Sequence, residues 1–115
     1  MRNLERLRLE KISPETKERL ILSVLDFIKA LTPALEVIFF GSIVTNRFDA
    51  WSDIDVIAIY KTHEAADQAR RTLYGSRRPD LGHPLEILCA PQNNFEQKSQ
   101  IGGVYAIAKE EGRSF

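Results

Sequence analysis

Two short runs of almost uninterrupted apolar residues constrain the fold of this chain more than any other feature. Residues 35–40 and 54–60 are rich in β-branched and aromatic side chains, and both runs are far shorter than the ~20 apolar residues of a membrane-spanning helix. Strands that are apolar on both faces belong at the centre of a covered sheet. A third run, residues 85–90, lies between two prolines and predicts a further strand.

Two longer segments predict helices. In residues 14–31 the apolar side chains recur at intervals of three and four, which is typical of a helix with one buried face. Ser13 is suited to the N-cap of this helix, and Pro14 is suited to its first position. Residues 62–73 predict a second helix, which Thr62 is expected to cap.

The remaining segments complete a mixed architecture. We expect a short helical turn over residues 42–47, a helix over residues 104–111 with Gly112 at its end, and the start of a fourth strand in the last three residues. The order helix, strand, strand, helix, strand, helix predicts an α/β (α+β) fold, with helices packed on a small mixed β-sheet of three to four strands. A chain of 115 residues is expected to form a single domain over residues 1–115.

Charge and cysteine content restrict the function and the compartment. Lys plus Arg total 16, as do Asp plus Glu, so the net charge is zero and no overall positive field attracts a long nucleic acid. Met1 to Glu10 lacks the apolar centre of a signal peptide, and no segment predicts a membrane span. A single cysteine, Cys89, excludes an internal disulfide, and we expect a cytoplasmic protein. Leu4 and Leu7 are expected to pack back on the domain.

Two short motifs lie at the ends of the buried strands. Gly41 and Ser42 follow the first strand, and the N–H groups of a helical turn at this point would bind phosphate. Asp53 and Asp55 open the second strand, where alternation places them on one face with Cα atoms about 6.5–7 Å apart. Carboxylates at this spacing can reach a shared pair of divalent ions, although a solvated strand end is the alternative.

The other candidate ligands are single residues. Glu86 is the one acid in the third strand, where burial would require a metal ion or a basic partner; the alternative is an edge strand that faces water. Asp80 is a rival third carboxylate, although its loop between proline and glycine is typical of a turn. His63 and His83 lack the spacing of metal ligands and are expected to be surface residues.

These motifs follow one another in a characteristic order. The order is Phe40-Gly41-Ser42, then Asp53-Ile54-Asp55-Val56 after the intervening residues 43–52, and then Glu86 in its own strand. This order of motifs resembles that of the nucleotidyltransferase superfamily of the DNA polymerase β type. The ending Ala106 to Gly112 is similar to the Lys/Glu-Gly close of the minimal nucleotidyltransferase (MNT) domains of that superfamily. The resemblance covers most of the chain.

The resemblance implies the nucleotidyltransferase fold and an enzyme that transfers a nucleoside monophosphate, AMP from ATP in the favoured case, to a hydroxyl group. It implies that Gly41 and Ser42 hold the β- and γ-phosphates, and that Asp53 and Asp55 carry the Mg²⁺ ion on them. All three acids, Glu86 included, would surround a second Mg²⁺ that lowers the pKa of the acceptor hydroxyl. Catalysis would consist of positioning and charge neutralisation.

One departure from the family pattern leaves two functions open. Minimal members often carry arginine two positions after the serine, whereas here the first basic residue is Arg47, the substitute candidate for binding the triphosphate. By resemblance, the acceptor is a tyrosine of a small helical HEPN-type toxin, the partner in a toxin–antitoxin system. The second hypothesis is a catalytically weak or inactive antitoxin that neutralises its partner by binding alone.

A docking surface for such a partner is expected beside the acids. Its anchors would be the residue types that dominate interfaces, namely Phe48, Trp51 and the pair Arg77-Arg78, in loops 43–52 and 75–84. Alternatively, Phe48 and Trp51 fix their own loop to the core, or Trp51 stacks on a base. The sequence leaves the acceptor, the preferred base and the oligomeric state open.

Overall fold

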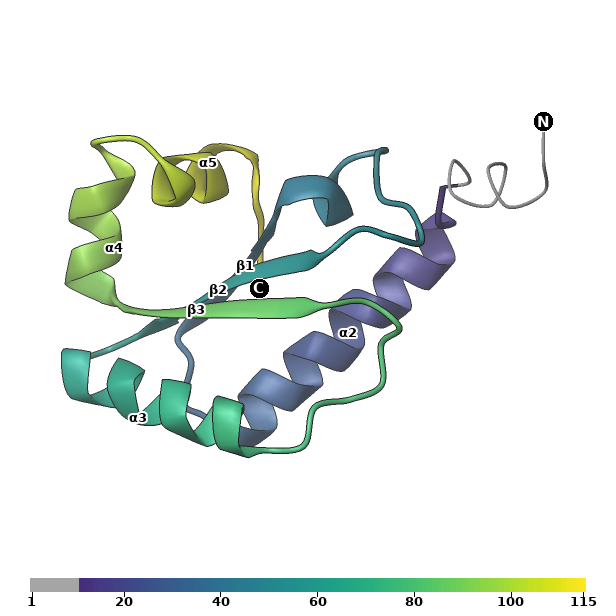
Figure 1. Ribbon diagram of the computed structural model, residues 1–115. Coiled ribbons are helices and arrows are strands. Elements are labelled where there is room, and N and C mark those ends of the chain that lie inside the picture. The colour runs from purple at the N-terminus through teal and green to yellow at the C-terminus, as the bar shows by residue number, and fades with distance from the viewer. Residues whose placement is uncertain (1–10) are drawn as a thin grey trace.

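A four-stranded sheet forms the centre of the structure, a computed structural model that describes residues 11–115. The strand order is β3-β2-β1-β4 (Figure 1). β1 (Glu36–Phe40) pairs antiparallel with β2 (Ile54–Tyr60) and with β4 (Arg113–Ser114), and β2 pairs parallel with β3 (Leu85–Pro91). The predicted mixed sheet is therefore confirmed, with β1 and β2 at its centre. The expected packing of Leu4 and Leu7 lies outside the described residues.

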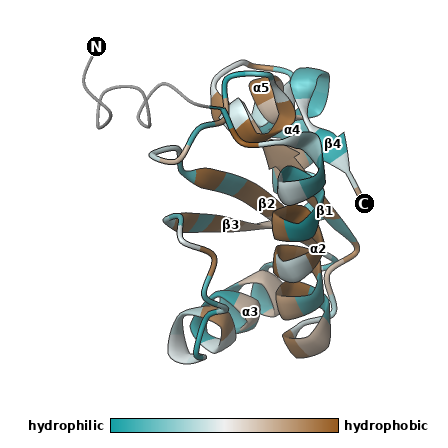
Figure 2. Ribbon diagram, turned by 90° about the vertical axis from the view of Figure 1, so that its right-hand side faces the viewer, coloured by the Kyte–Doolittle hydropathy of each residue, from teal (hydrophilic) through white to brown (hydrophobic). Residues whose placement is uncertain are grey.

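Helices lie on both faces of this sheet. α2 (Pro14–Leu31) and α3 (His63–Gly75) pack on one face, and α4 (Gln92–Ser99) and α5 (Val104–Glu111) pack on the other. Figure 2 shows the hydrophobic strands between these two pairs of helices. No helix within residues 11–115 is both long enough and apolar enough to cross a membrane.

Alternation along the strands divides the buried side chains between two cores. The α2–α3 core includes Val37, Phe39, Val56 and Tyr60. The α4–α5 core includes Ile38, Ile57, Ile59, Phe95 and Ala108. Neighbouring positions of β1 and β2 are thus buried on opposite faces, which explains why these two runs are apolar without alternation.

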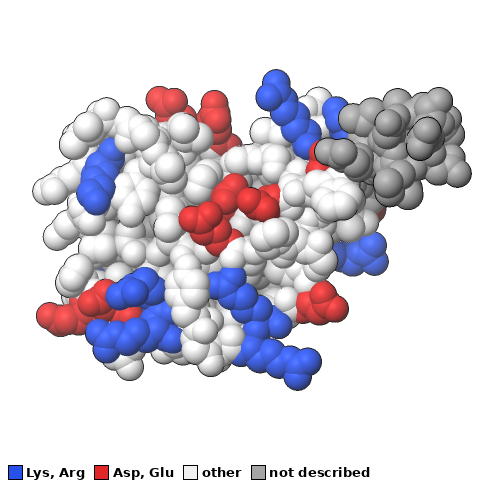
Figure 3. Space-filling view, viewed as in Figure 1, with Lys and Arg blue, Asp and Glu red and all other residues white. Residues whose placement is uncertain are grey.

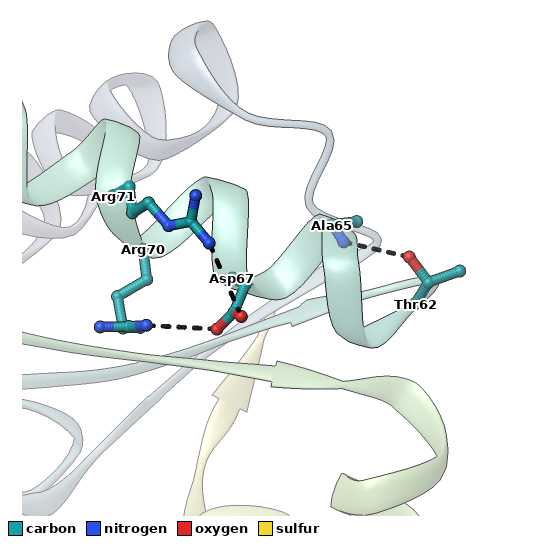
Figure 4. A network of polar contacts seen from close by, with 5 residues as sticks. All are labelled: Thr62, Ala65, Asp67, Arg70 and Arg71. Carbon is teal, nitrogen blue, oxygen red and sulfur yellow. Dashed lines mark hydrogen bonds and ion pairs between the residues drawn. The ribbon is translucent and has the colours of Figure 1, made fainter.

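The two helices expected before β1 and after β2 are confirmed, together with their caps. α2 begins at Pro14, and the Ser13 side-chain oxygen accepts a hydrogen bond of 3.2 Å from the Thr16 N–H. α3 begins after Thr62, whose hydroxyl accepts a bond of 3.1 Å from the Ala65 N–H (Figure 4). These caps satisfy N–H groups that the first turn of a helix leaves without partners.

The end of α3 differs from its prediction. The helix continues to Gly75, two residues beyond the expected end, so Arg70 and Arg71 do not lie in its last turn. Both instead pair with Asp67, at 3.2 Å and 3.9 Å, on the exposed side of the helix (Figure 4). Exposed pairs of this kind contribute little to stability.

Two features of the C-terminal part were not predicted. α4 has only two buried residues, Phe95 and Ser99, so no apolar stripe marks it in the sequence. Gly112 follows α5 as expected, but its φ of −74° is not left-handed. Glycine is needed there for space, since a Cβ atom would lie 2.2 Å from the Ala108 carbonyl oxygen and 2.5 Å from Ile38 Cγ2. The predicted fourth strand is confirmed as β4.

Candidate nucleotide site

Two of the candidate acids are direct neighbours across the sheet. The register of β2 and β3 pairs Asp55 with Glu86, and residues paired in parallel strands point to the same face. The alternation that buries Ile57 against the α4–α5 core places both acids on that face. Asp55 is half-buried and Glu86 is exposed. Figure 3 shows acidic side chains gathered at the centre of the visible surface, over β2 and β3.

Gly41 lies directly against the Asp55 carboxylate. A Cβ atom at Gly41 would be 2.9 Å from Asp55 Oδ2, and the φ of Gly41 is +76°. Glycine is favoured by both features, since other residues rarely adopt this conformation and any side chain would collide with the carboxylate. Gly41, Asp55 and Glu86 therefore form a row that crosses from the end of β1 over β2 to β3.

The turn after β1 is short and closed by Thr45. η1, a 3₁₀ helix, spans Gly41–Val44, so it begins one residue before and ends three residues before the helical turn expected over residues 42–47. The Thr45 N–H and hydroxyl both donate to the Ser42 carbonyl oxygen, each at 3.0 Å. The first N–H groups of such a turn have no carbonyl partner within it, which suits them to an anion.

Like charges dominate the electrostatics of this row. Burial raises the pKa of Asp55 above its ordinary value, and the negative charges of Glu86 and Asp53 raise it further. Within residues 11–115, no hydrogen bond or ion pair neutralises any of these three carboxylates. The ionised acids thus repel one another, which a bound cation would relieve.

The burial argument for Glu86 was wrong. β3 is an edge strand and the Glu86 side chain is exposed, so this carboxylate needs no metal ion or basic partner to be tolerated. What links Glu86 to the site is its register with Asp55, which the sequence does not reveal. The rival acid, Asp80, is exposed in the loop before β3 and is not among the charges that act on Asp55.

A network that sequence reasoning missed fixes the loop before Asp53. The Asp49 carboxylate accepts hydrogen bonds from the Trp51 N–H and the Ser52 hydroxyl, at 2.9 Å and 3.0 Å. His83 lies across this loop, with its Nδ1 2.8 Å from the Ser52 carbonyl oxygen. The spacing of Asp49 and Ser52 is a recognisable turn signal, whereas nothing local marks His83, which is half-buried rather than a surface residue.

The basic residues near the turn are placed differently from the expectation. The Lys17 ammonium donates to the Thr45 carbonyl oxygen at 2.9 Å, a contact between α2 and the end of η1 that spans 28 residues. Arg47 is exposed, and its backbone N–H bonds to the Thr45 hydroxyl. Within residues 11–115, no hydrogen bond or ion pair joins the Arg47 side chain to the acids.

The other predicted anchors separate into core and surface residues. Phe48 is buried, with its ring 4.8 Å from that of His83, so it fixes its own loop and cannot anchor a partner. Trp51 remains 67% exposed. Arg78 also serves the fold, because it donates to the Leu85 carbonyl oxygen and lies over the Tyr74 ring at 5.0 Å.

The donor set suits a hard cation that arrives with a ligand. Within residues 11–115, no group of three or more His, Cys, Asp or Glu side chains is arranged to hold a metal ion on its own. Mg²⁺ usually takes one or two carboxylates and completes its shell with water and substrate phosphates. Asp55 and its acidic neighbours beside the Gly41 turn fit that requirement, and no softer ligand is present among them.

The comparisons with known proteins give one finding. The sequence model described as "Nucleotidyltransferase domain" matches residues 21–113, which include both motifs and all four strands except the last residue of β4. No curated protein and no solved structure was found to match significantly.

Proposed function

The chain belongs to the nucleotidyltransferase domain family, and from this premise we propose that it transfers AMP from ATP to a hydroxyl group of a partner protein. The observation that supports this proposal best is the row of Gly41, Asp55 and Glu86 on one face of the sheet. It places a turn suited to phosphate next to two carboxylates, which no ion pair within residues 11–115 neutralises.

Each residue of the row has a distinct task in this proposal. Gly41 and Ser42 would bind the β- and γ-phosphates, because the bare backbone at Gly41 leaves the first N–H groups of η1 accessible. Asp53 and Asp55 would hold the Mg²⁺ that accompanies the phosphates, and Glu86 would join them at a second ion. When bound, these ions would neutralise phosphate charge and lower the pKa of the acceptor hydroxyl.

Beyond binding the substrates and the ions, the protein must align the reacting groups. The acceptor oxygen forms a bond to the α-phosphorus while the bond from that phosphorus to the β-phosphate oxygen breaks, and pyrophosphate leaves. The acceptor and the leaving group must lie in line, on opposite sides of the α-phosphorus. With the pyrophosphate at Gly41, the acceptor hydroxyl would approach the α-phosphorus from the opposite side.

We further propose that the acceptor is a tyrosine of a small helical HEPN-type toxin in the cytoplasm, a partner that the family resemblance implies. The zero net charge supports a protein acceptor over a long nucleic acid. The exposed side chains of Trp51 and Arg77, in the loops before β2 and β3, supply residue types that favour protein contacts.

A binding-only antitoxin is the second candidate, because the basic residues close to η1 are poorly placed to bind a triphosphate. No basic side chain follows Ser42 before Arg47, and the Lys17 ammonium is engaged with the Thr45 carbonyl. A weakened grip on the triphosphate would leave a fold that binds its partner without modifying it.

One experiment separates the two candidates. The protein is incubated with labelled ATP, Mg²⁺ and a purified small helical HEPN-type protein, and that protein is then analysed by mass spectrometry. An added AMP that disappears in the Asp55→Asn variant supports the transferase. A tight complex without added mass, together with no ATP binding by calorimetry, supports the binding-only antitoxin.

A further inference from the structure

A pocket lies on the acidic face of the sheet, between β3 and the helices α4 and α5. Its volume is about 530 Å³, within the range of about 300–1,000 Å³ of small-molecule sites. It is lined by Leu88, Lys98, Ile101, Gly102, Val104 and Tyr105.

The pocket lies next to the row of acids along β3. Leu88 follows Glu86 by two residues in β3, so the two side chains share a face and are separated by about 6.5 Å along the strand. Glu86 is in register with Asp55, which in turn contacts the turn at Gly41. A ligand that extends from Gly41 past the acids therefore reaches this pocket.

The lining suits a flat ring with a polar edge. Tyr105 offers an aromatic surface, and Ile101 and Val104 are apolar side chains that remain 85% and 47% exposed. The single charge is the Lys98 ammonium, 5.6 Å from the centre of the Tyr105 ring, where it can donate to ring or hydroxyl oxygens and ring nitrogens. Bases stack on such surfaces with little regard to sequence.

We infer that this pocket holds the base and ribose of the nucleoside triphosphate. The inference rests on the proposed function, because it takes the triphosphate to lie over Gly41 and the acids. The nucleoside is bonded to the α-phosphate through its 5′ oxygen, so it must lie next to the acids. The pocket near Glu86 offers an aromatic wall and a donor on that face.

The test compares two probes that differ by the nucleoside. Mg²⁺–ATP and Mg²⁺–tripolyphosphate are titrated calorimetrically into the parent and into two double variants. Ile101→Ser with Val104→Ser removes two walls of the pocket. Leu22→Ser with Ile107→Ser is the matched control, since these side chains are 53% and 47% exposed but lie outside the lining.

We expect the pocket variant to bind ATP on the order of tenfold more weakly than the parent, because contacts with the base are lost. Its affinity for tripolyphosphate should stay within about twofold of that of the parent. The control should bind both probes like the parent. Thermal unfolding confirms that each variant is folded. Tyr105→Leu keeps the bulk of the side chain but removes the aromatic ring, and this variant should also bind ATP more weakly than the parent.

Three outcomes would overturn the inference. Parent-like ATP affinity in both the pocket variant and Tyr105→Leu places the nucleoside elsewhere. A parent that binds tripolyphosphate as tightly as ATP shows that the nucleoside makes no contact. A parent that binds neither probe contradicts the proposed function, and this inference with it.

Discussion

Replacing Asp55 by asparagine should stabilise the protein in the absence of divalent cations. The change keeps the shape of the side chain beside Gly41 but removes its charge. The raised pKa of Asp55 means that the ionised carboxylate is less favourable in the folded protein than in the unfolded chain. Asparagine therefore removes an unfavourable contribution that the parent carries at neutral pH.

The magnitude follows from the register with Glu86. Paired residues on neighbouring strands lie about 5 Å apart, and two unit charges at that distance repel by about 0.8 kcal/mol in bulk water and about 3 kcal/mol at an effective dielectric constant of 20. Glu86 is exposed, so the value lies near the lower limit. We expect a gain of about 1 kcal/mol, which raises the midpoint of thermal unfolding by about 4 °C.

The assay is thermal unfolding with and without Mg²⁺–ATP, and Asp80→Asn is the control. Asp80 is an exposed loop residue, so its replacement should change stability by less than about 0.5 kcal/mol. Saturating Mg²⁺–ATP should stabilise the parent and the control but not Asp55→Asn. If Asp55→Asn unfolds at a lower temperature than the parent without cations, Asp55 is a structural residue and the reasoning fails.

Three further predictions concern residues of the core and of the loop before β2. Tyr60→Phe removes a buried 2.7 Å hydrogen bond to Thr32 and should lower stability by about 0.5–1.5 kcal/mol. Because burial raises the pKa of Tyr60 to about 12, the parent should lose more stability than this variant as the pH rises from about 10 through 12 in denaturant titrations. Gly112→Ala should lower stability by about 1–3 kcal/mol or more in urea unfolding, since its Cβ collides with the Ala108 carbonyl; an unchanged midpoint contradicts this. His83→Ala should loosen the loop before β2 and weaken Mg²⁺–ATP binding several-fold by calorimetry, whereas unchanged affinity limits His83 to packing.

The sequence predicted those parts of the fold that depend on local signals. The two central strands are apolar at most positions, on both of their faces, because both faces are buried. The helices α2 and α3 begin at side chains that cap their first N–H groups. Local signals of this kind need no knowledge of the rest of the chain. α4 lacked one, because its helical stripe contains a single apolar residue, Phe95.

The site was predictable in its residue types but not in its geometry. Asp55 and Glu86 were chosen from motif order, whereas their adjacency depends on the register of two strands separated by a helix and a long loop. Lys17 and His83 reach the site from distant segments and carry no local signal. Gly112 was expected for its conformation and is required for space, a distinction that only tertiary contacts make.

The position of the acids explains how the fold tolerates their repulsion. Asp55 lies between Ile54 and Val56, both fully buried in the central strand, so the burial of its neighbours holds the backbone in place whatever the charge of the carboxylate. The unfavourable electrostatics are thereby confined to side chains at one open end of a rigid sheet. A cation with its phosphates would relieve them without moving the strands, and the gain in stability on binding should exceed that of a site with neutral ligands. The difference in unfolding temperature between the parent and Asp55→Asn can therefore be measured across a Mg²⁺–ATP titration. That difference reports the occupancy of the proposed site directly.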